Sequence, residues 1–133
     1  PPGFRYSEFN DLEAAREAGL RRAVVSSSTN AHDVLVAARI EKLLEARIDG
    51  VVAERQHLKG KPAPDMYLAG ARALDLAPDA AAVFEDALAG VEAGRAGGFA
   101  SVVGVDRVGH AKALREHGAT VVVRDLAELL EER

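Results

Sequence analysis

Short runs of apolar residues alternate with longer amphipathic stretches along the chain. The short runs are continuous rather than alternating, which is typical of strands that are buried on both faces. The longer stretches repeat apolar residues about every 3.6 positions, which predicts helices. We expect strands at 22–26, 49–53, 80–84, 100–105 and 120–123. We expect helices at 8–19, 31–47, 64–76, 87–96, 110–117 and 125–132.

This alternation indicates an α/β fold with a doubly wound parallel sheet of the Rossmann-like type. Parallel strands need a long crossover between them, so strands separated by helices predict βαβ units. In open parallel sheets, ligands bind at the carboxyl ends of the strands. The residues that follow each predicted strand are therefore the first place to look for function.

The size and composition of the chain limit the classes of function. Its 133 residues favour a single domain with one core. The net charge of −4 gives no indication of a nucleic-acid or anionic-membrane partner. The absence of cysteine excludes disulfides and thiolate metal sites. No apolar run approaches a membrane span, and the first residues do not resemble a signal peptide, so we expect a cytoplasmic protein.

A polar stretch, Ser26-Ser27-Ser28-Thr29-Asn30, follows the first predicted strand. Hydroxyl groups and backbone N–H groups ahead of a helix suit an oxyanion such as phosphate. The same residue types are the preferred N-caps of any helix. A phosphate site and a simple helix cap are therefore both open from these residues alone.

A lysine in the loop LKGKPAPD is the second candidate. Lys61 stands between Gly60, which is flexible, and Pro62, which is conformationally fixed. A lysine held in this way can place a positive charge on a phosphoryl group. The alternative is a solvated loop lysine ahead of a helix that starts near Pro64. Lys59 is the nearest competing lysine.

An acidic pair, Glu85 and Asp86, directly follows the predicted strand at 80–84. Carboxylates are ligands that Mg²⁺ prefers. Neighbouring residues at a strand end point in different directions, so we expect one acid to ligate a metal ion and the other to orient waters or pair with Lys61. The alternative is that both acids only stabilise the start of the following helix. Taken with Ser26, these groups are the set that phosphoryl transfer requires.

Three motifs in this order, VVSSSTN, GKPAPDMY and VFEDALAGVEAG, resemble those of the haloacid dehalogenase-like superfamily. The resemblance covers residues 12–130 and is greatest to the β-phosphoglucomutase-like subfamily and related sugar-phosphate phosphatases. It implies Mg²⁺-dependent phosphoryl transfer on a small sugar phosphate through an aspartyl-phosphate intermediate.

The resemblance also implies a role for individual residues. Ser26 would hydrogen-bond the transferring phosphoryl group and Lys61 would neutralise it. Asp86 would ligate Mg²⁺, and Glu85 would support that metal site. The implied catalytic residues are Lys61, Ser26 and Asp86; the implied phosphate-binding residues are Ser26, Ser27, Ser28, Asn30 and Lys61; the implied metal residues are Asp86 and Glu85.

One part of the family pattern does not occur in these 133 residues. The family's nucleophile lies in a D-x-D-G motif on the central strand of the sheet, and this sequence contains no D-x-D. Asp106, which also follows a long apolar run, is not accepted as a replacement. We therefore expect one incomplete core domain over residues 1–133, with residues 1–7 left from a cap or linker, and no activity of the chain alone.

The missing strand has a predicted place in the sheet. By the same resemblance it would lie between the strands at 22–26 and 80–84. The gap would be filled by an upstream segment of the same gene product, which is the favoured alternative, by a second chain, or by collapse of the two strands onto each other.

Two other classes of protein share the alternation of strands and helices. A flavodoxin-like or receiver-like binding domain should carry a glycine-rich phosphate loop or an early acidic pair, and neither G-x-G-x-x-G nor G-x-x-x-x-G-K-[ST] is present. A structural fragment without activity is the other alternative. The expected partner is a small phosphorylated substrate, with no nucleic acid and no membrane.

Overall fold

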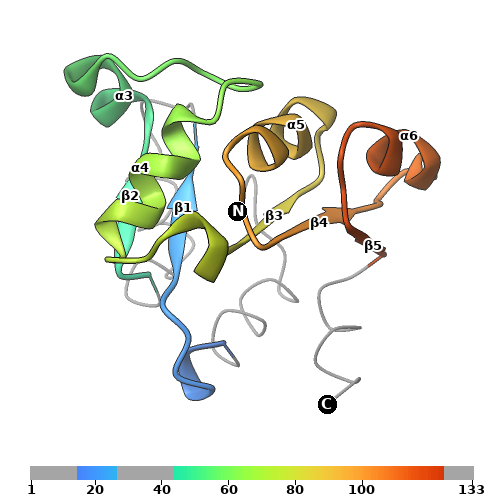
Figure 1. Cartoon of the computed structure of the whole chain (residues 1–133), viewed down its shortest axis with the longest axis horizontal. Helices are drawn as coiled ribbons and strands as arrows, with labels where there is room; N and C mark the ends of the chain where they lie inside the picture. The colour runs from blue at the N-terminus through green and yellow to red at the C-terminus, as the bar shows by residue number, and fades with distance from the viewer. Residues whose placement is uncertain (1–14, 27–43, 125–133) are drawn as a thin grey trace.

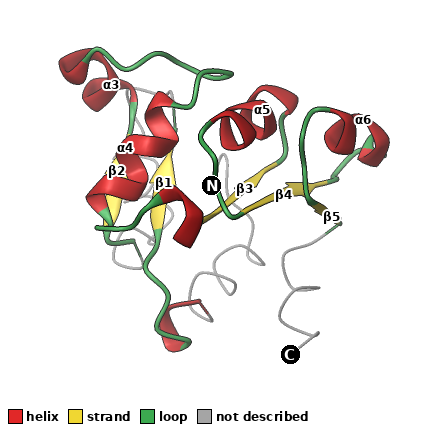
Figure 2. Ribbon diagram, in the orientation of Figure 1, coloured by secondary structure: helices red, strands yellow, loops and turns green. Residues whose placement is uncertain are grey.

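The computed structural model describes residues 15–26 and 44–124, and all structural statements below refer to these residues. The strands are β1 (Ala23–Val25), β2 (Ala46–Ile48), β3 (Ala82–Glu85), β4 (Ser101–Val105) and β5 (Val121–Val123). The helices are α3 (Gly50–Gln56), α4 (Asp65–Ala73), the 3₁₀ turn η2 (Pro78–Ala80), α5 (Leu88–Ala96) and α6 (Ala111–Glu116). From β3 to β5 strands and helices alternate along the chain (Figure 2), and all the strand pairs are parallel, which confirms the predicted α/β class.

The strands form two parallel sheets. One sheet pairs β1 with β2, and the other has the order β3-β4-β5. Helix α4 packs on the first sheet, while α5 and α6 lie together on one face of the second (Figure 1). Within the described residues β1 and β3 do not pair with each other.

A shared core joins the two sheets. Val25 of β1 packs against a buried cluster that includes Val83 of β3 and Tyr67 of α4. Val25 also contacts the cluster of Ile48 and Met66, which lies between the first sheet and α4. The core is therefore continuous from one sheet to the other, although their strands are not hydrogen-bonded to each other.

The segment around residues 46–56 folds differently from its prediction. The strand predicted at 49–53 is wrong, because Gly50–Gln56 form α3, and the end of the helix predicted at 31–47 is wrong, because Ala46–Ile48 form β2. Asp49 is the physical reason. It is buried, and its Oδ1 accepts a hydrogen bond from the backbone N–H of Val52 at 3.0 Å, which caps the helix. This cap outweighs the strand preference of two adjacent valines.

Other predicted segments lie outside the described residues: most of the helix at 8–19, residues 31–43, the helix at 125–132, and the cap or linker remnant at 1–7. The predicted helix stop at Gly19 is described. Its φ of 80° is left-handed, a conformation that glycine adopts without strain, and the N–H of Leu20 donates back to the carbonyl of Ala15 at 3.0 Å. Across the described part of the chain, no helix has the length and apolar character needed to span a bilayer.

Candidate active site

The predicted site residues that the structure describes stand after strands or in a loop next to them. Ser26 follows β1, is half-buried, and donates its backbone N–H to the carbonyl of Ile48 at 2.8 Å. Glu85 ends β3 and Asp86 follows it. Lys61 lies in the loop between α3 and α4. The other predicted phosphate-binding residues, Ser27, Ser28 and Asn30, lie outside the described residues.

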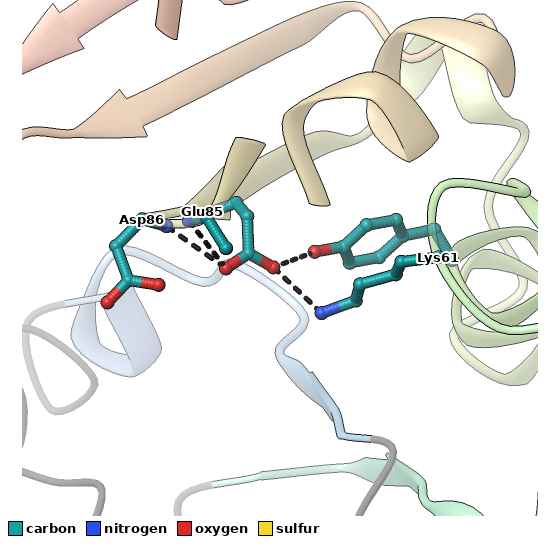
Figure 3. Close-up of polar contacts among 5 residues, drawn as sticks. Lys61, Glu85 and Asp86 are labelled. Carbon is teal, nitrogen blue, oxygen red and sulfur yellow. Dashed lines mark hydrogen bonds and ion pairs between the residues drawn. The ribbon is translucent and has the colours of Figure 1, made fainter. Parts of the chain in front are cut away.

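Lys61 and Glu85 come together from distant parts of the chain. The Nζ of Lys61 donates to the Oε2 of Glu85 at 2.7 Å, as Figure 3 shows. Both side chains are mostly buried, with exposed fractions of 22% for Lys61 and 12% for Glu85. Lys59, by contrast, is exposed, and its backbone N–H bonds to Asp65. The loop thus directs one of its two lysines to the end of β3.

The carboxylate of Glu85 is surrounded by donors. Its Oε2 also accepts from the hydroxyl of Tyr67 at 2.6 Å. Its Oε1 accepts from the backbone N–H groups of Asp86 at 3.0 Å and Ala87 at 3.2 Å. Four donors match the roughly four acceptor positions of an ionised carboxylate. Burial opposes ionisation of Glu85, but these hydrogen bonds, from Lys61 and Tyr67 above all, outweigh it and lower its pKa.

Gly90, in the first turn of α5, makes room for the Glu85 side chain. A Cβ at this position would lie 2.1 Å from the Cγ of Glu85. No real side chain tolerates that distance, so the glycine is a requirement of the acid's position. The small residues that follow the acidic pair therefore allow the helix to lie close behind it.

Asp86 has a different environment from its neighbour. Its carboxylate points away from Lys61 (Figure 3), and its side chain is 51% exposed. The Nε of Arg107, just after β4, lies 3.3 Å from its Oδ2. Burial and the adjacent Glu85 raise the pKa of Asp86, and Arg107 opposes that shift.

The donor set at Asp86 suits a hard cation. A half-exposed carboxylate oxygen beside a second acid fits Mg²⁺, which takes oxygen ligands and usually keeps several waters. Among the described residues, no group of three or more Asp, Glu, His or Cys side chains could hold a metal ion. Any Mg²⁺ at Asp86 therefore needs water or further ligands to fill its coordination shell.

Two residues of this site, Tyr67 and Arg107, were not singled out from the sequence. Tyr67 ends the motif GKPAPDMY and lies in the first turn of α4. Its hydrogen bond to Glu85 depends on how α4 packs near the end of β3, which the sequence does not show. Arg107 follows the strand end at Asp106, so a search of every strand end could have found it. Asp106 itself accepts hydrogen bonds from Gly109 and His110 ahead of α6, which is a structural role.

Comparisons with known proteins give the family. Residues 11–98, more than half of the chain, match the haloacid dehalogenase-like hydrolases. The chain belongs to this family. The motif pattern of the sequence predicted it, and membership decides against the flavodoxin-like alternative.

Two curated relatives of the chain have names that indicate phosphorylated sugars as their substrates. A β-phosphoglucomutase of Mycobacterium bovis is 57% identical over 122 residues, which cover 90% of this chain and 47% of the relative. A phosphorylated carbohydrates phosphatase of Thermotoga maritima is 32% identical over 124 residues, which cover 92% of this chain and 55% of the relative. The chain thus spans about half the length of these relatives.

A solved family structure has the same fold. The crystal structure of a haloacid dehalogenase family hydrolase from Deinococcus radiodurans R1, with bound phosphate and sodium, superposes with a TM-score of 0.82 at 32% identity. The superposition covers 94% of this chain and 56% of that one. The two parallel sheets described above therefore have the arrangement found in the corresponding part of that structure.

Proposed function

We propose that the protein carrying this chain transfers a phosphoryl group of a small sugar phosphate in a Mg²⁺-dependent reaction. A mutase that acts on β-glucose 1-phosphate is the first candidate and a sugar-phosphate phosphatase the second. The observation that carries the proposal is the buried pair of Lys61 and Glu85 next to the exposed carboxylate of Asp86. Family membership and the two curated relatives support the substrate class.

Each residue of the site has a proposed task. Lys61 places its ammonium group on the transferring phosphoryl oxygens, since its bond to Glu85 leaves other N–H donors for a substrate. Ser26 donates its hydroxyl to the same group. Asp86 is the ligand for Mg²⁺, and Glu85 supports that site by holding Lys61 and, through its Oε1, the backbone of Asp86. Mg²⁺, when bound, would neutralise charge on the phosphoryl group.

The proposed nucleophile is an aspartate that is not among these residues. The sequence has no D-x-D, and β1 and β3 each have an unpaired edge within the described residues. Each buried backbone N–H or C=O group without a partner destabilises the folded state by about 1–3 kcal/mol, so leaving the gap between β1 and β3 unfilled would destabilise the fold. We propose that a strand from another segment of the same protein, or from a second chain, fits between β1 and β3 and brings the aspartate to the site.

The test is an assay of the protein expressed from its natural gene. It is incubated with β-glucose 1-phosphate, with and without Mg²⁺, while glucose 6-phosphate and inorganic phosphate are measured separately. Glucose 6-phosphate marks a mutase, and inorganic phosphate marks a phosphatase. The isolated 133-residue chain is expected to form neither product.

Asp86 provides the matched metal test. Asp86→Asn keeps the size of the side chain but removes the charge that a cation needs, so we expect Mg²⁺ binding by calorimetry and turnover to fall together. Glu116→Gln removes an exposed carboxylate on α6 and should change neither. Tight Mg²⁺ binding that survives Asp86→Asn would contradict the assignment of the metal ligand. Full activity of the isolated chain would contradict the external nucleophile.

A further inference from the structure

We propose that Tyr67 is a positioning residue for Lys61: its hydroxyl group fixes the carboxylate of Glu85, to which Lys61 binds, and its ring lies beside the ammonium group of Lys61. The inference rests on the proposed function, because it assumes that Lys61 meets the phosphoryl group. It goes beyond that function in naming what fixes the lysine. Tyr67 lies in the first turn of α4, close in sequence to Lys61 but on a rigid element rather than in a loop.

The geometry places three groups around one oxygen atom. The hydroxyl of Tyr67 donates to the Oε2 of Glu85 at 2.6 Å, and the Nζ of Lys61 donates to the same oxygen at 2.7 Å. The Nζ of Lys61 also lies 5.0 Å from the centroid of the Tyr67 ring, within the range of a cation–π contact. Lys61 is therefore held by its carboxylate partner and by the aromatic ring beside it.

Tyr67 is itself well fixed. It is 8% exposed, and its ring meets the edge of Phe99 with the centroids 6.1 Å apart at an angle of 74°. Buried Val83 and Ala93 belong to the same cluster. A ring with two torsions in a packed core loses little further freedom, whereas a lysine has a long flexible side chain with large rotamer entropy. The tyrosine can thus transmit the rigidity of the core to a loop lysine.

A purely structural role for Tyr67 makes a different prediction. In that case the ring fills the core, and Glu85 only satisfies a buried hydroxyl that would otherwise lack a partner. Removal of the hydroxyl would then change stability but not the behaviour of Lys61. The two roles separate when the reactivity of the lysine is measured directly.

The experiment compares Tyr67→Phe with the unchanged protein, both expressed from the natural gene. Each is labelled briefly with an acylating ester, and tandem mass spectrometry measures the labelling of Lys61 relative to Lys59 in the same molecule. Exposed Lys59 is the internal standard. Tyr67→Phe keeps the ring and removes the hydroxyl, so we expect the Lys61 to Lys59 ratio to rise about three- to tenfold, the scale of a weakened hydrogen bond to a charged group. Tyr67→Leu, which also removes the ring, should raise the ratio further.

Leu114→Ala is the matched control. Leu114 is fully buried in a cluster with Val91 and Val102 that does not include Tyr67, so its truncation should lower the stability and leave the labelling ratio unchanged. An unchanged ratio in Tyr67→Phe overturns the proposal. An equal rise in Leu114→Ala overturns it as well, because general loosening would then explain the effect.

Turnover gives a second readout. With β-glucose 1-phosphate as substrate, Tyr67→Phe should lower kcat about three- to tenfold with KM within twofold, since the lysine acts on the developing charge. An unchanged kcat would overturn the catalytic part of the inference. If the unchanged protein shows no phosphoryl transfer, the proposed function fails, while the labelling ratio still decides whether Tyr67 holds Lys61.

Discussion

Asp49 and Glu85 are two buried acids at the ends of parallel strands, and similar kinds of hydrogen-bond donors stabilise their carboxylates. Asp49 follows β2, its side chain is 4% exposed, and it accepts from Arg47 Nε at 2.8 Å and from the backbone of Val52. Glu85 ends β3, is 12% exposed, and accepts from Lys61, Tyr67 and two backbone N–H groups. Each acid thus combines a cation with backbone donors.

The two acids differ in where their partners come from. Arg47 is two residues from Asp49, and Val52 is three residues from it, so that arrangement is local and caps a helix. Lys61 is 24 residues from Glu85, and the pair joins a loop to the end of another strand. A second acid, Asp86, lies next to Glu85 with half of its surface exposed. The comparison teaches that a buried acid indicates a site when its cation is distant in sequence and an accessible acid stands beside it.

The largest expected effect concerns Lys61. In the protein expressed from its natural gene, Lys61→Ala should raise the activation barrier by roughly 3 kcal/mol, about as much as the loss of one preorganised oxyanion donor. Lys59→Ala should be nearly silent, because Lys59 is exposed and its backbone rather than its side chain bonds to Asp65. The measurement is kcat/KM for a sugar phosphate. Equal losses of kcat/KM at the two lysines would contradict a functional role for the pair of Lys61 and Glu85.

Gly90 gives the next largest effect. Gly90→Ala forces the Glu85 side chain to move, since the new Cβ would lie 2.1 Å from its Cγ. We expect a loss of about 1–3 kcal/mol in the free energy of unfolding, as for other overpacked sites, together with a fall in kcat. Gly60→Ala is the control, because its Cβ would meet nothing within 4 Å. Denaturant titration and turnover of both variants check the prediction, and an unaffected Gly90→Ala would mean that Glu85 is not fixed as described.

Of the two buried acids, Asp49 and Glu85, we expect Asp49 to have a structural role only. Asp49→Ala removes the cap of α3 and is expected to cost about 0.5–2 kcal/mol of stability. Its kcat should remain that of the unchanged protein, since within the described residues Asp49 makes no hydrogen bond or ion pair with Lys61, Glu85 or Asp86. If Asp49→Ala lowers kcat while the protein remains fully folded, an acid whose partners are near in sequence also matters for activity. The sequence distance to the partner would then not distinguish a structural acid from a functional one.

The pH dependence of Asp49 is the smallest expected effect. Burial opposes ionisation of Asp49, but the hydrogen bonds from Val52 and Arg47 lower its pKa below the ordinary value of 3.8. The folded state then binds fewer protons than the unfolded state between the two pKa values. The stabilisation is fully present above about pH 4 and is lost as the pH falls through the lower folded pKa. Asp49→Asn, which keeps a cap but has no charge to lose, should show a flatter decline of stability between pH 5 and pH 3 in denaturant titrations, and parallel curves would contradict the shift.

The fold was largely predictable from the sequence because three strands, β3, β4 and β5, are continuous apolar runs with helices between them. The exception was β2, a three-residue strand with exposed Arg47 at its centre, which carries no apolar run to mark it. The valines after Asp49 predict a strand because the sequence does not show the backbone conformation in which Asp49 caps a helix. Local pattern and tertiary environment gave opposite signals there.

The candidate site was predictable only where residues stand next to a strand end or in a motif. Glu85 and Asp86 were found from their position, and pairing of one of them with Lys61 was anticipated. Tyr67 was not, because its link to Glu85 depends on how α4 packs across β3. The roles of Ser26, Lys61 and Asp86 in catalysis stay predictions until the variants are measured.

The pairing of each strand with its neighbour in the chain has a consequence for how the molecule folds. In every ladder the partner strands begin roughly 20 residues apart, so each ladder closes only a short loop. The contact of Tyr67 with Glu85 spans 18 residues, so it closes a loop no longer than the ladders do. We therefore expect the site to assemble together with the strands rather than after them. In a Tyr6→Phe variant of the 133-residue chain Tyr67 is the single tyrosine, and its stopped-flow fluorescence should coincide with the far-ultraviolet circular dichroism signal. A fluorescence signal that lags would mean that the site forms in a separate, later step.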